Sequence, residues 1–280
     1  MVPAWVSHRV SASSWEPVGG GYTRAPKFRA LARDETGVFV KFAEDDDLAV
    51  RAIVAELVVY ESLSAPFLPV LYGAFQAHDK ALLILEDLSK AHWPPPYPPD
   101  IAPLFAALDA LAAVRPPDGL PTLAEPAETP WRQIARAPEA FLSLGVCSGT
   151  WLIKALPTLI EAEACVPRSG SQLVHNDVWA GNLCFADRGA LLVDWAEARV
   201  GNAAIDRAFA LLSLRVEGAP VSAIDDEPAL AAFVTGIVAA EASAPLPAWA
   251  PAGSTLRSDQ LGDLRVALPW AAGELGLPPP

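Results

Sequence analysis

Two carboxylates and one side-chain amide lie between Leu173 and Trp195, at a spacing that suits metal-assisted chemistry. Asp177 and Asn182 are five residues apart, and Asp194 follows twelve residues later at the end of an apolar run. Carboxylate and amide oxygens are the ligands that Mg²⁺ prefers, and a carboxylate can take a proton from a hydroxyl group. The pattern His-x-Asp-x-x-x-x-Asn followed by an aspartate can therefore supply a base and metal ligands for phosphoryl transfer.

A reaction of this kind also needs a positive group to hold the phosphates, and Lys41 is the candidate. It lies in the apolar run Val38–Phe42, while Glu56 lies beside the apolar stripe of an expected helix. Considered singly, each has an ordinary interpretation: Lys41 would extend from an edge strand to solvent, and Glu56 would be a solvated helix residue. The alternative is an ion pair in which Glu56 holds the ammonium against phosphate oxygens. Gly19–Gly21 would let backbone approach the same phosphates, or would form only a tight hairpin turn.

The residues before about position 88 have the pattern of short strands with one helix among them. Runs of β-branched, aromatic and other apolar residues between turn residues predict the strands. Apolar residues at three- and four-residue spacing predict the helix, and Asp45–Asp47 favour its start. The expected strands are Ser11–Val18, Lys27–Arg33, Val38–Phe42, Val70–His78 and Ala81–Leu85, and the expected helix runs from Asp46 to Leu63.

The proline run Pro94–Pro99 interrupts regular structure and introduces a larger part in which helices dominate. We place the division after Leu88, which gives domains of residues 1–88 and 89–280. The expected helices are Asp100–Val114, Trp131–Leu144, Thr150–Cys165, Ala208–Leu214, Pro228–Ala242 and Asp259–Leu275. Short strands are expected at Gln172–Val174, Leu183–Phe185 and Ala190–Val193, and a helix cap at Asp225–Glu227.

Composition excludes several classes of protein. The 280 residues are 52% hydrophobic and 19% charged, as in a globular chain with a sizeable core. A formal net charge of −13 repels phosphate backbones, so we expect no nucleic-acid partner. Three separated cysteines argue against a disulfide framework or zinc site and favour a reducing cytoplasm. No signal peptide is visible, and the apolar run Ala229–Ala240 is too short to span a bilayer, so we expect no membrane partner.

Together the motifs resemble the aminoglycoside phosphotransferase and choline kinase superfamily, which has the protein-kinase-like fold. They occur in family order over roughly Gly19 to Leu214. The motifs are Val38–Lys41, Ala55–Tyr60, Glu86–Leu88, His175–Asn182, Val193–Trp195 and Gly201–Asp206. The resemblance implies an α+β fold with two lobes. The N-lobe would be a small antiparallel sheet with one helix, and the C-lobe would be larger and mainly helical.

The same resemblance implies roles for the central residues. Asp177 is implied to be the catalytic base, and Asn182 and Asp194 the Mg²⁺ ligands. Lys41 is implied to hold the α- and β-phosphates of ATP, with Glu56 orienting it. Mg²⁺ and ATP are thus the expected cofactors.

Further residues complete the implied nucleotide site. Gly20 and Gly21 would bring backbone to the phosphates, and the backbone from Glu86 to Leu88 would pair with adenine. His175 and Asp206 are implied to brace the catalytic loop by hydrogen bonds.

The chain departs from the family pattern at two positions of the catalytic loop. Asn176 replaces the glycine most often found in aminoglycoside kinases, as it does in choline and ethanolamine kinases. Trp179 is unusually bulky and could either pack against the loop or form a wall of the substrate site. No Ala-Pro-Glu signature follows Asp194, which argues against a protein substrate.

The leading hypothesis is an ATP- and Mg²⁺-dependent phosphotransferase acting on a hydroxyl of a small molecule, such as an aminoglycoside, a choline-like amino alcohol or an amino sugar. Acidic residues after Asp194 could attract a cationic acceptor, or could simply be solvated; they are Glu197, Asp225, Asp226 and Glu227. One alternative is a catalytically silent nucleotide-binding module, against which the complete set of site residues argues. Another is an unrelated α+β hydrolase with a carboxylate pair, which would bind no ATP.

Overall fold

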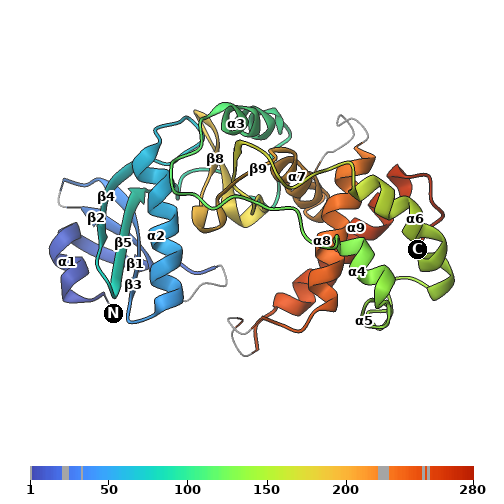
Figure 1. The fold of residues 1–280 in the computed structure, drawn as a ribbon. Coiled ribbons are helices and arrows are strands. Elements are labelled where there is room, and N and C mark those ends of the chain that lie inside the picture. The colour runs from blue at the N-terminus through green and yellow to red at the C-terminus, as the bar shows by residue number, and fades with distance from the viewer. Residues whose placement is uncertain (1, 21–24, 33, 220–226, 248–249, 251–252) are drawn as a thin grey trace.

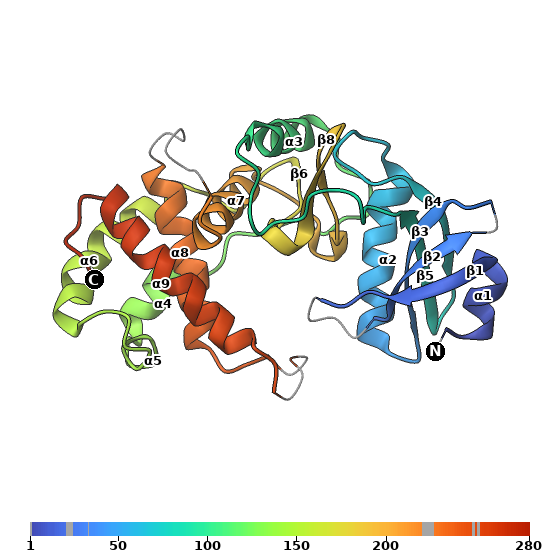
Figure 2. The same ribbon diagram turned by 180° about the vertical axis from the view of Figure 1, so that it is seen from behind.

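The chain folds into two lobes that lie side by side (Figure 1). The computed structural model describes residues 2–20, 25–32, 34–219, 227–247, 250 and 253–280. One lobe contains a five-stranded sheet and the other is mainly helical, so the expected α+β, two-lobed architecture is confirmed. The N-terminus lies in the sheet lobe and the C-terminus at the far end of the helical lobe (Figure 2).

The N-lobe sheet is antiparallel throughout, with the strand order β1-β2-β3-β5-β4. Its strands are β1 (Ala12–Pro17), β2 (Lys27–Ala32), β3 (Gly37–Glu44), β4 (Leu71–Gln76) and β5 (Lys80–Glu86). All five were expected from the sequence, within three residues at each end that the structure describes. Arg33, the expected end of the second strand, lies outside the described residues.

The two faces of this sheet are covered by different helices. The long helix α2 (Asp47–Ser62) lies on the face that turns toward the C-lobe, and the short helix α1 (Ala4–Val10) lies at the opposite side (Figures 1 and 2). The Asp46 carboxylate caps α2 by accepting hydrogen bonds from the amides of Leu48 and Ala49, as its position before the helix predicts. The sheet therefore has an enclosed apolar outer face and an inner face that can carry a site.

Helix α1 was not expected from the sequence, because seven residues form a marginal helix on their own. Its Val6 is fully buried and Val10 nearly so, in a cluster with Val40 and Phe42 of β3. The Trp5 indole also donates a hydrogen bond to the Glu44 carboxylate at 2.9 Å. Packing against the sheet therefore stabilises this helix.

Helices make up most of the C-lobe. They are α3 (Ala102–Ala113), α4 (Pro130–Arg136), α5 (Glu139–Leu142), α6 (Gly149–Glu163), α7 (Ala204–Val216), α8 (Pro228–Ser243) and α9 (Leu256–Glu274). The single helix expected over Trp131–Leu144 is wrong: it is two helices, α4 and α5. Pro138 cannot donate an amide hydrogen bond, and Ala137 before it leaves the helical region, with φ −141° and ψ 75°.

Two small antiparallel sheets of two strands each lie in the C-lobe, beneath α3 in Figure 1. They are β6 (Gln172–Val174) with β9 (Arg199–Gly201) and β7 (Leu183–Ala186) with β8 (Gly189–Leu192). The expected strands here are confirmed, but β9 was not expected, because it exists through pairing with β6, which is distant in the chain. The 3₁₀ turns η1 (Ala180–Asn182) and η2 (Trp195–Glu197) lie beside these strands and carry part of the candidate site.

The expected cap of α8 is partly outside the described residues, which exclude Asp225 and Asp226. Glu227 does occupy the N-cap position, but its side chain makes no capping hydrogen bond, so that part of the expectation is wrong. Its carboxylate instead accepts from Arg207 at 3.0 Å, because an arginine is the stronger partner. No helix in the described part of the chain is long and apolar enough to cross a membrane.

Candidate active site

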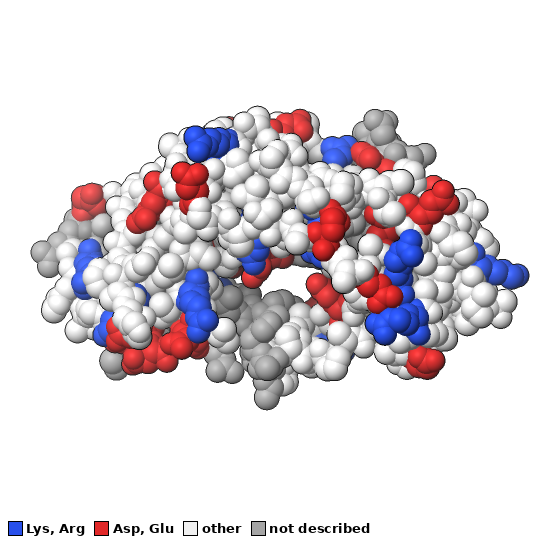
Figure 3. All heavy atoms as spheres, viewed as in Figure 1, with Lys and Arg blue, Asp and Glu red and all other residues white. Residues whose placement is uncertain are grey.

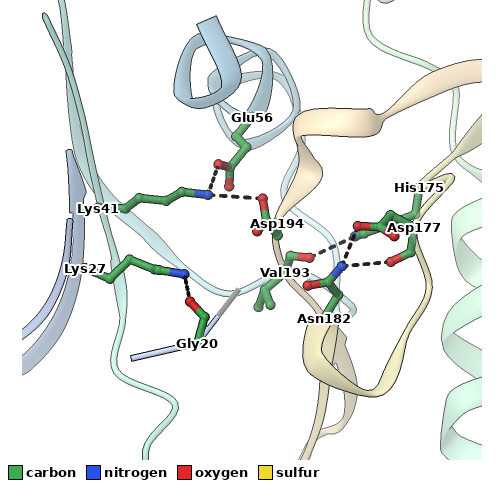
Figure 4. Close-up of polar contacts among 9 residues, drawn as sticks. All are labelled: Gly20, Lys27, Lys41, Glu56, His175, Asp177, Asn182, Val193 and Asp194. Carbon is green, nitrogen blue, oxygen red and sulfur yellow. Dashed lines mark hydrogen bonds and ion pairs between the residues drawn. The ribbon is translucent and has the colours of Figure 1, made fainter. Parts of the chain in front are cut away.

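Lys41, on β3, connects the two lobes through its ammonium group. Its Nζ lies 2.6 Å from Glu56 Oε1 of α2 and 3.1 Å from Asp194 Oδ1 of the C-lobe (Figure 4). Lys41 and Glu56 are 3% and 1% exposed, so neither is the solvated surface residue of the ordinary interpretation. The ion pair expected between them forms, and Asp194 joins it from a position 153 residues away in the chain.

The charges of this cluster follow from burial and from the short separations. Burial alone would lower the pKa of Lys41, but the carboxylates of Glu56 and Asp194 raise it above its ordinary value. Burial raises the pKa of Glu56 to about 7, against the effect of Lys41. Burial would also raise the pKa of Asp194, but the Lys41 charge holds it below its ordinary value. The proton therefore stays on the lysine nitrogen, and Asp194 is ionised at neutral pH.

Asp177 and Asn182 form a second pair a short distance from the first (Figure 4). Asn182 Nδ2 donates to the Asp177 carboxylate at 2.8 Å and to its backbone carbonyl at 3.0 Å. The Val193 amide donates to the backbone carbonyl of Asn182 at 2.9 Å, which fixes Asn182 next to the segment that carries Asp194. The three polar residues predicted from the sequence to act together are thus brought to one place.

The surroundings of Asp177 favour its protonated form. Burial, and secondly the negative charge of Asp194, raise the pKa of Asp177 to about 7. Glu197 and Glu241 add smaller effects in the same direction. A carboxyl group with a pKa near neutrality can exchange a proton with a bound hydroxyl under physiological conditions.

His175 and Asp206 hold the loop that carries Asp177. The buried Asp206 carboxylate accepts hydrogen bonds from the amides of His175 and Asn176, at 2.8 and 2.7 Å. His175 Nε2 donates to the Val193 carbonyl at 2.9 Å, next to Asp194. Burial lowers the pKa of His175 to about 4, so its ring is neutral and this nitrogen carries the hydrogen. One histidine and one aspartate therefore tie the loop to both α7 and the Asp194 segment.

Two residues of the site have left-handed backbone conformations. Asn176 has φ 66° and Asp194 has φ 64°. Glycine, asparagine and aspartate tolerate this region best. This explains why asparagine can stand at position 176, where a glycine was the expectation for aminoglycoside kinases. The left-handed conformations of Asn176 and Asp194 turn the backbone sharply next to Asp177 and at Asp194 itself. Such strained conformations are common in functional sites.

Replacing Asp206 by asparagine should lower the free energy of unfolding by roughly 2–4 kcal/mol, because one of the two buried amides would face an NH₂ group and lose its acceptor. Denaturant unfolding followed by fluorescence measures this. The matched control is Asp109→Asn on the exposed side of α3, which should change stability little. An Asp206→Asn variant as stable as the wild type would show that these hydrogen bonds do not hold the loop.

The side-chain oxygens of Asn182 and Asp194 are suitable ligands for a divalent metal ion that also binds phosphate oxygens. Among the described residues, no group of three His, Cys, Asp or Glu side chains could hold a metal ion. Asn182 directs its NH₂ group to Asp177, which leaves Oδ1 as its metal-binding atom. Mg²⁺ typically binds one or two carboxylates, phosphate oxygens and waters, so Asn182 and Asp194 suit it when phosphates complete the shell. The surface is hollowed between the lobes, with both acidic and basic side chains around the hollow (Figure 3).

The segment Glu86–Leu88, which was expected to contact a nucleotide, already makes several polar contacts within the protein. The Glu86 side chain pairs with Arg188, and the Glu86 amide donates to the Val70 carbonyl. The Leu88 carbonyl accepts from the Trp93 indole at 2.9 Å. The Leu88 amide has no hydrogen-bond acceptor in the described part of the chain. Of the amides of Glu86 and Leu88, that of Leu88 is therefore the one available to a nucleotide base.

Gly20 and Trp179 also have defined positions. Gly20 has φ 96° and lies in the connection after β1, whereas Gly21 lies outside the described residues. Trp179 packs its ring against Phe209 of α7, with 5.8 Å between ring centroids, and is half-buried. Packing thus accounts for Trp179 at least in part. Glu197, a candidate for attracting a cation, is paired with Arg199 at 2.8 Å.

Two charged residues of the site were missed in the sequence. Lys27 lies opposite Lys41 in the β2–β3 register, whereas a turn at Asp34–Gly37 would have placed it opposite Glu44, because Gly37 belongs to β3 and pairs with Leu31. Arg188 lies in the β7–β8 turn, and its Nη1 and Nη2 donate to the Glu86 carboxylate. Nothing local signals that contact, since it joins residues 102 positions apart.

Comparisons with known proteins give the family of the chain and its fold. The model of a phosphotransferase enzyme family matches residues 14–253. A choline/ethanolamine kinase family protein from Mesorhizobium loti has 13% identity and a TM-score of 0.55, with 95% of this chain and 92% of that chain covered. No curated protein sequence matches.

Two further solved structures have similar folds. A macrolide 2′-phosphotransferase from Brachybacterium faecium has 16% identity and a TM-score of 0.50, with 97% of this chain and 89% of that chain covered. An amicoumacin kinase, solved with AMP-PNP and Ca²⁺, has 8% identity and a TM-score of 0.50, with 93% and 92% covered. At these identities the likeness shows a shared protein-kinase-like fold, as expected from the sequence.

Proposed function

The chain belongs to the phosphotransferase enzyme family, and we propose that it transfers the γ-phosphate of ATP to a hydroxyl group of a small molecule in a Mg²⁺-dependent reaction. The observation that carries the proposal is the contact of Lys41 with both Glu56 and Asp194. It brings a buried cation from the N-lobe to the oxygen ligands of the C-lobe. The Asp177–Asn182 pair beside them supplies a candidate base.

In this proposal each residue has a distinct task. Lys41 binds the α- and β-phosphates, and Glu56 keeps its ammonium in place. Asn182 and Asp194 hold Mg²⁺, which would offset the negative charge on the phosphate oxygens. Asp177 accepts the proton of the acceptor hydroxyl as its oxygen attacks phosphorus.

The nucleotide base would lie against the segment that links the lobes. We propose that the Leu88 amide and the backbone at Glu86 pair with adenine, and that Gly20 and Gly21 bring backbone to the phosphates. The lobes then act as two units, residues 1–88 and 89–280, with the nucleotide between them. The amicoumacin kinase of similar fold was solved with AMP-PNP, which supports nucleotide binding by this chain.

The acceptor in this proposal is a small molecule, and a cationic group would favour its binding. The negative charges of Asp194, Glu197 and Glu241 all act on Asp177, so an amine near the reacting hydroxyl would be attracted. Arg199 offsets part of the Glu197 charge. The free state of the cysteines Cys147, Cys165 and Cys184 supports a cytoplasmic location.

Mg²⁺ with ATP at millimolar concentration should raise the melting temperature by several degrees. A ligand at 100 times its Kd stabilises a protein by about 2.7 kcal/mol. Adding EDTA should reduce the shift, because Asn182 and Asp194 would lose the metal that links them to the phosphates. Thermal melts with ATP, GTP and adenosine measure it. The absence of any shift with every nucleotide would contradict the proposal.

The acceptor can be sought by measuring ATP consumption with aminoglycosides, choline, ethanolamine, amino sugars, homoserine and macrolides. Acceptor-dependent consumption with one class is the expected result. Nucleotide binding without consumption in a broad set of hydroxyl compounds would instead favour a silent nucleotide-binding module.

A further inference from the structure

Lys27, the first residue of β2, faces the same space as Lys41. The two lysines are direct partners in the β2–β3 register, and side chains of directly opposed residues lie on the same face of a sheet. Figure 4 shows both side chains extending from the sheet toward the C-lobe segment that carries Asp194. The charges of Lys41, Asp194 and Glu56 all act on the pKa of Lys27, and the Lys27 charge in turn acts on that of Asp194. Lys27 is therefore part of the cluster around the candidate phosphate site.

The positive charges of the two lysines are neutralised to different extents. Lys41 contacts two carboxylates, whereas Lys27 has no ion-pair partner among the residues that the structure describes. Its Nζ donates to the neutral Gly20 carbonyl at 2.5 Å. Burial, and then the Lys41 charge, lower the pKa of Lys27. Like charges directly opposite each other destabilise a sheet, so an anion between the lysines would relieve an unfavourable arrangement.

The place of this anion follows from the sheet. Lys41 pairs with Leu83, which lies three residues before Glu86 at the end of β5. Three residues of a strand span about 10 Å. A base held near Glu86 and Leu88 would therefore extend its phosphates toward Lys41 and Lys27. The Gly20 carbonyl keeps the Lys27 ammonium at the glycine turn that borders this space.

We propose that Lys27 is a second phosphate-binding cation, which contacts the polyphosphate from the side of the glycine turn while Lys41 contacts it from the side of Glu56 and Asp194. The inference rests on the proposed nucleotide-binding function. An ammonium has three donors, so Lys27 can keep its contact with Gly20 and still bind phosphate oxygen. The expected ligand is a nucleoside di- or triphosphate.

The competing explanation is that Lys27 only fastens the turn through the Gly20 carbonyl. The two explanations differ in the effect expected of Lys27→Arg, which keeps the positive charge of the side chain but alters its geometry. A lost phosphate contact weakens the binding of ADP and ATP but leaves that of adenosine unchanged. If Lys27 only fastens the turn, Lys27→Arg should weaken the binding of ADP and ATP as much as Lys27→Gln does, although it keeps the positive charge.

Calorimetric titration with adenosine, ADP and ATP, at fixed Mg²⁺, tests the proposal without turnover. Lys27→Gln should weaken ADP and ATP by roughly tenfold or more, the worth of a charge-assisted hydrogen bond, and leave adenosine unchanged. Lys27→Arg should keep most of the affinity. The matched control is Lys154→Gln, at an exposed position of α6, which should bind all three as the wild type does.

Three results would overturn the inference. Wild-type affinity of Lys27→Gln for ATP would remove Lys27 from the phosphate site but leave the proposed function intact. Equal losses of ADP and ATP binding in Lys27→Gln and Lys27→Arg would assign Lys27 to the turn alone. A wild-type protein that binds no nucleotide would overturn both the inference and the proposed function.

Discussion

Replacing Asp177 by asparagine should lower kcat by about 10²–10⁴-fold, the usual contribution of a general base, and leave the affinity for Mg²⁺ and ATP nearly unchanged. The substitution keeps the size of the side chain and one oxygen that can accept from Asn182 Nδ2. It removes the group that would take the hydroxyl proton. Since Lys41, Glu56 and Asp194 are untouched, the nucleotide-dependent rise in melting temperature should persist.

The matched control is Asp187→Asn, which removes an exposed carboxylate from the β7–β8 turn of the same lobe. Initial rates with the acceptor found by the ATP-consumption screen give kcat, and thermal melts give nucleotide binding. If Asp177→Asn turned over at the wild-type rate, another group would be the base. If it lost nucleotide binding as well, Asp177 would belong to the metal site.

Replacing Lys41 by methionine should both destabilise the protein and abolish the thermal shift with Mg²⁺ and ATP. Glu56 would remain fully enclosed without its cation, and removing one partner of a buried ion pair typically costs about 3–5 kcal/mol. Asp194 would lose the contact that joins it to the N-lobe. Denaturant unfolding measures the first effect, and melts with and without nucleotide measure the second.

A second substitution separates these causes. Adding Glu56→Gln to Lys41→Met removes the unpaired buried charge, so the double variant should be more stable than Lys41→Met alone. It should still give no thermal shift with nucleotide. Lys80→Met is the control, because the pair of Lys80 with Glu44 in the same sheet is partly exposed and should contribute about 0–1 kcal/mol. Equal losses in Lys41→Met and Lys80→Met would contradict the assignment.

Some of the site could be derived from the sequence because its signals are local. A strand that ends in an aspartate, a loop with an acid and an amide at fixed spacing, and a helix with one glutamate beside its apolar stripe are each readable within twenty residues. The resemblance to kinases then ordered these pieces. The position of Lys27 could not be derived in this way, because the expected turn at Asp34–Gly37 would place it opposite Glu44, whereas Gly37 belongs to β3 and pairs with Leu31.

Other features have no local signal. The hydrogen bonds of Asp206 to the amides of His175 and Asn176 join residues about thirty positions apart, and Arg188 reaches Glu86 over 102 positions. The short helix α1 exists because the sheet covers Val6 and Val10, since a helix of seven residues is marginal without such packing. Conversely, Pro138 did indicate the break between α4 and α5, but the prediction relied on helical periodicity alone and missed it.

The sequence by itself determined the chemical groups of this protein and the elements that carry them, because periodicity, turn residues and helix caps act over a few residues. Tertiary structure decided which charges meet. Only the packing of α2 and the C-lobe against the N-lobe sheet places the Glu56 and Asp194 carboxylates on one lysine. Desolvation at that place makes the contacts strong. Lys27, opposite Lys41 in the sheet, has no carboxylate partner among the described residues.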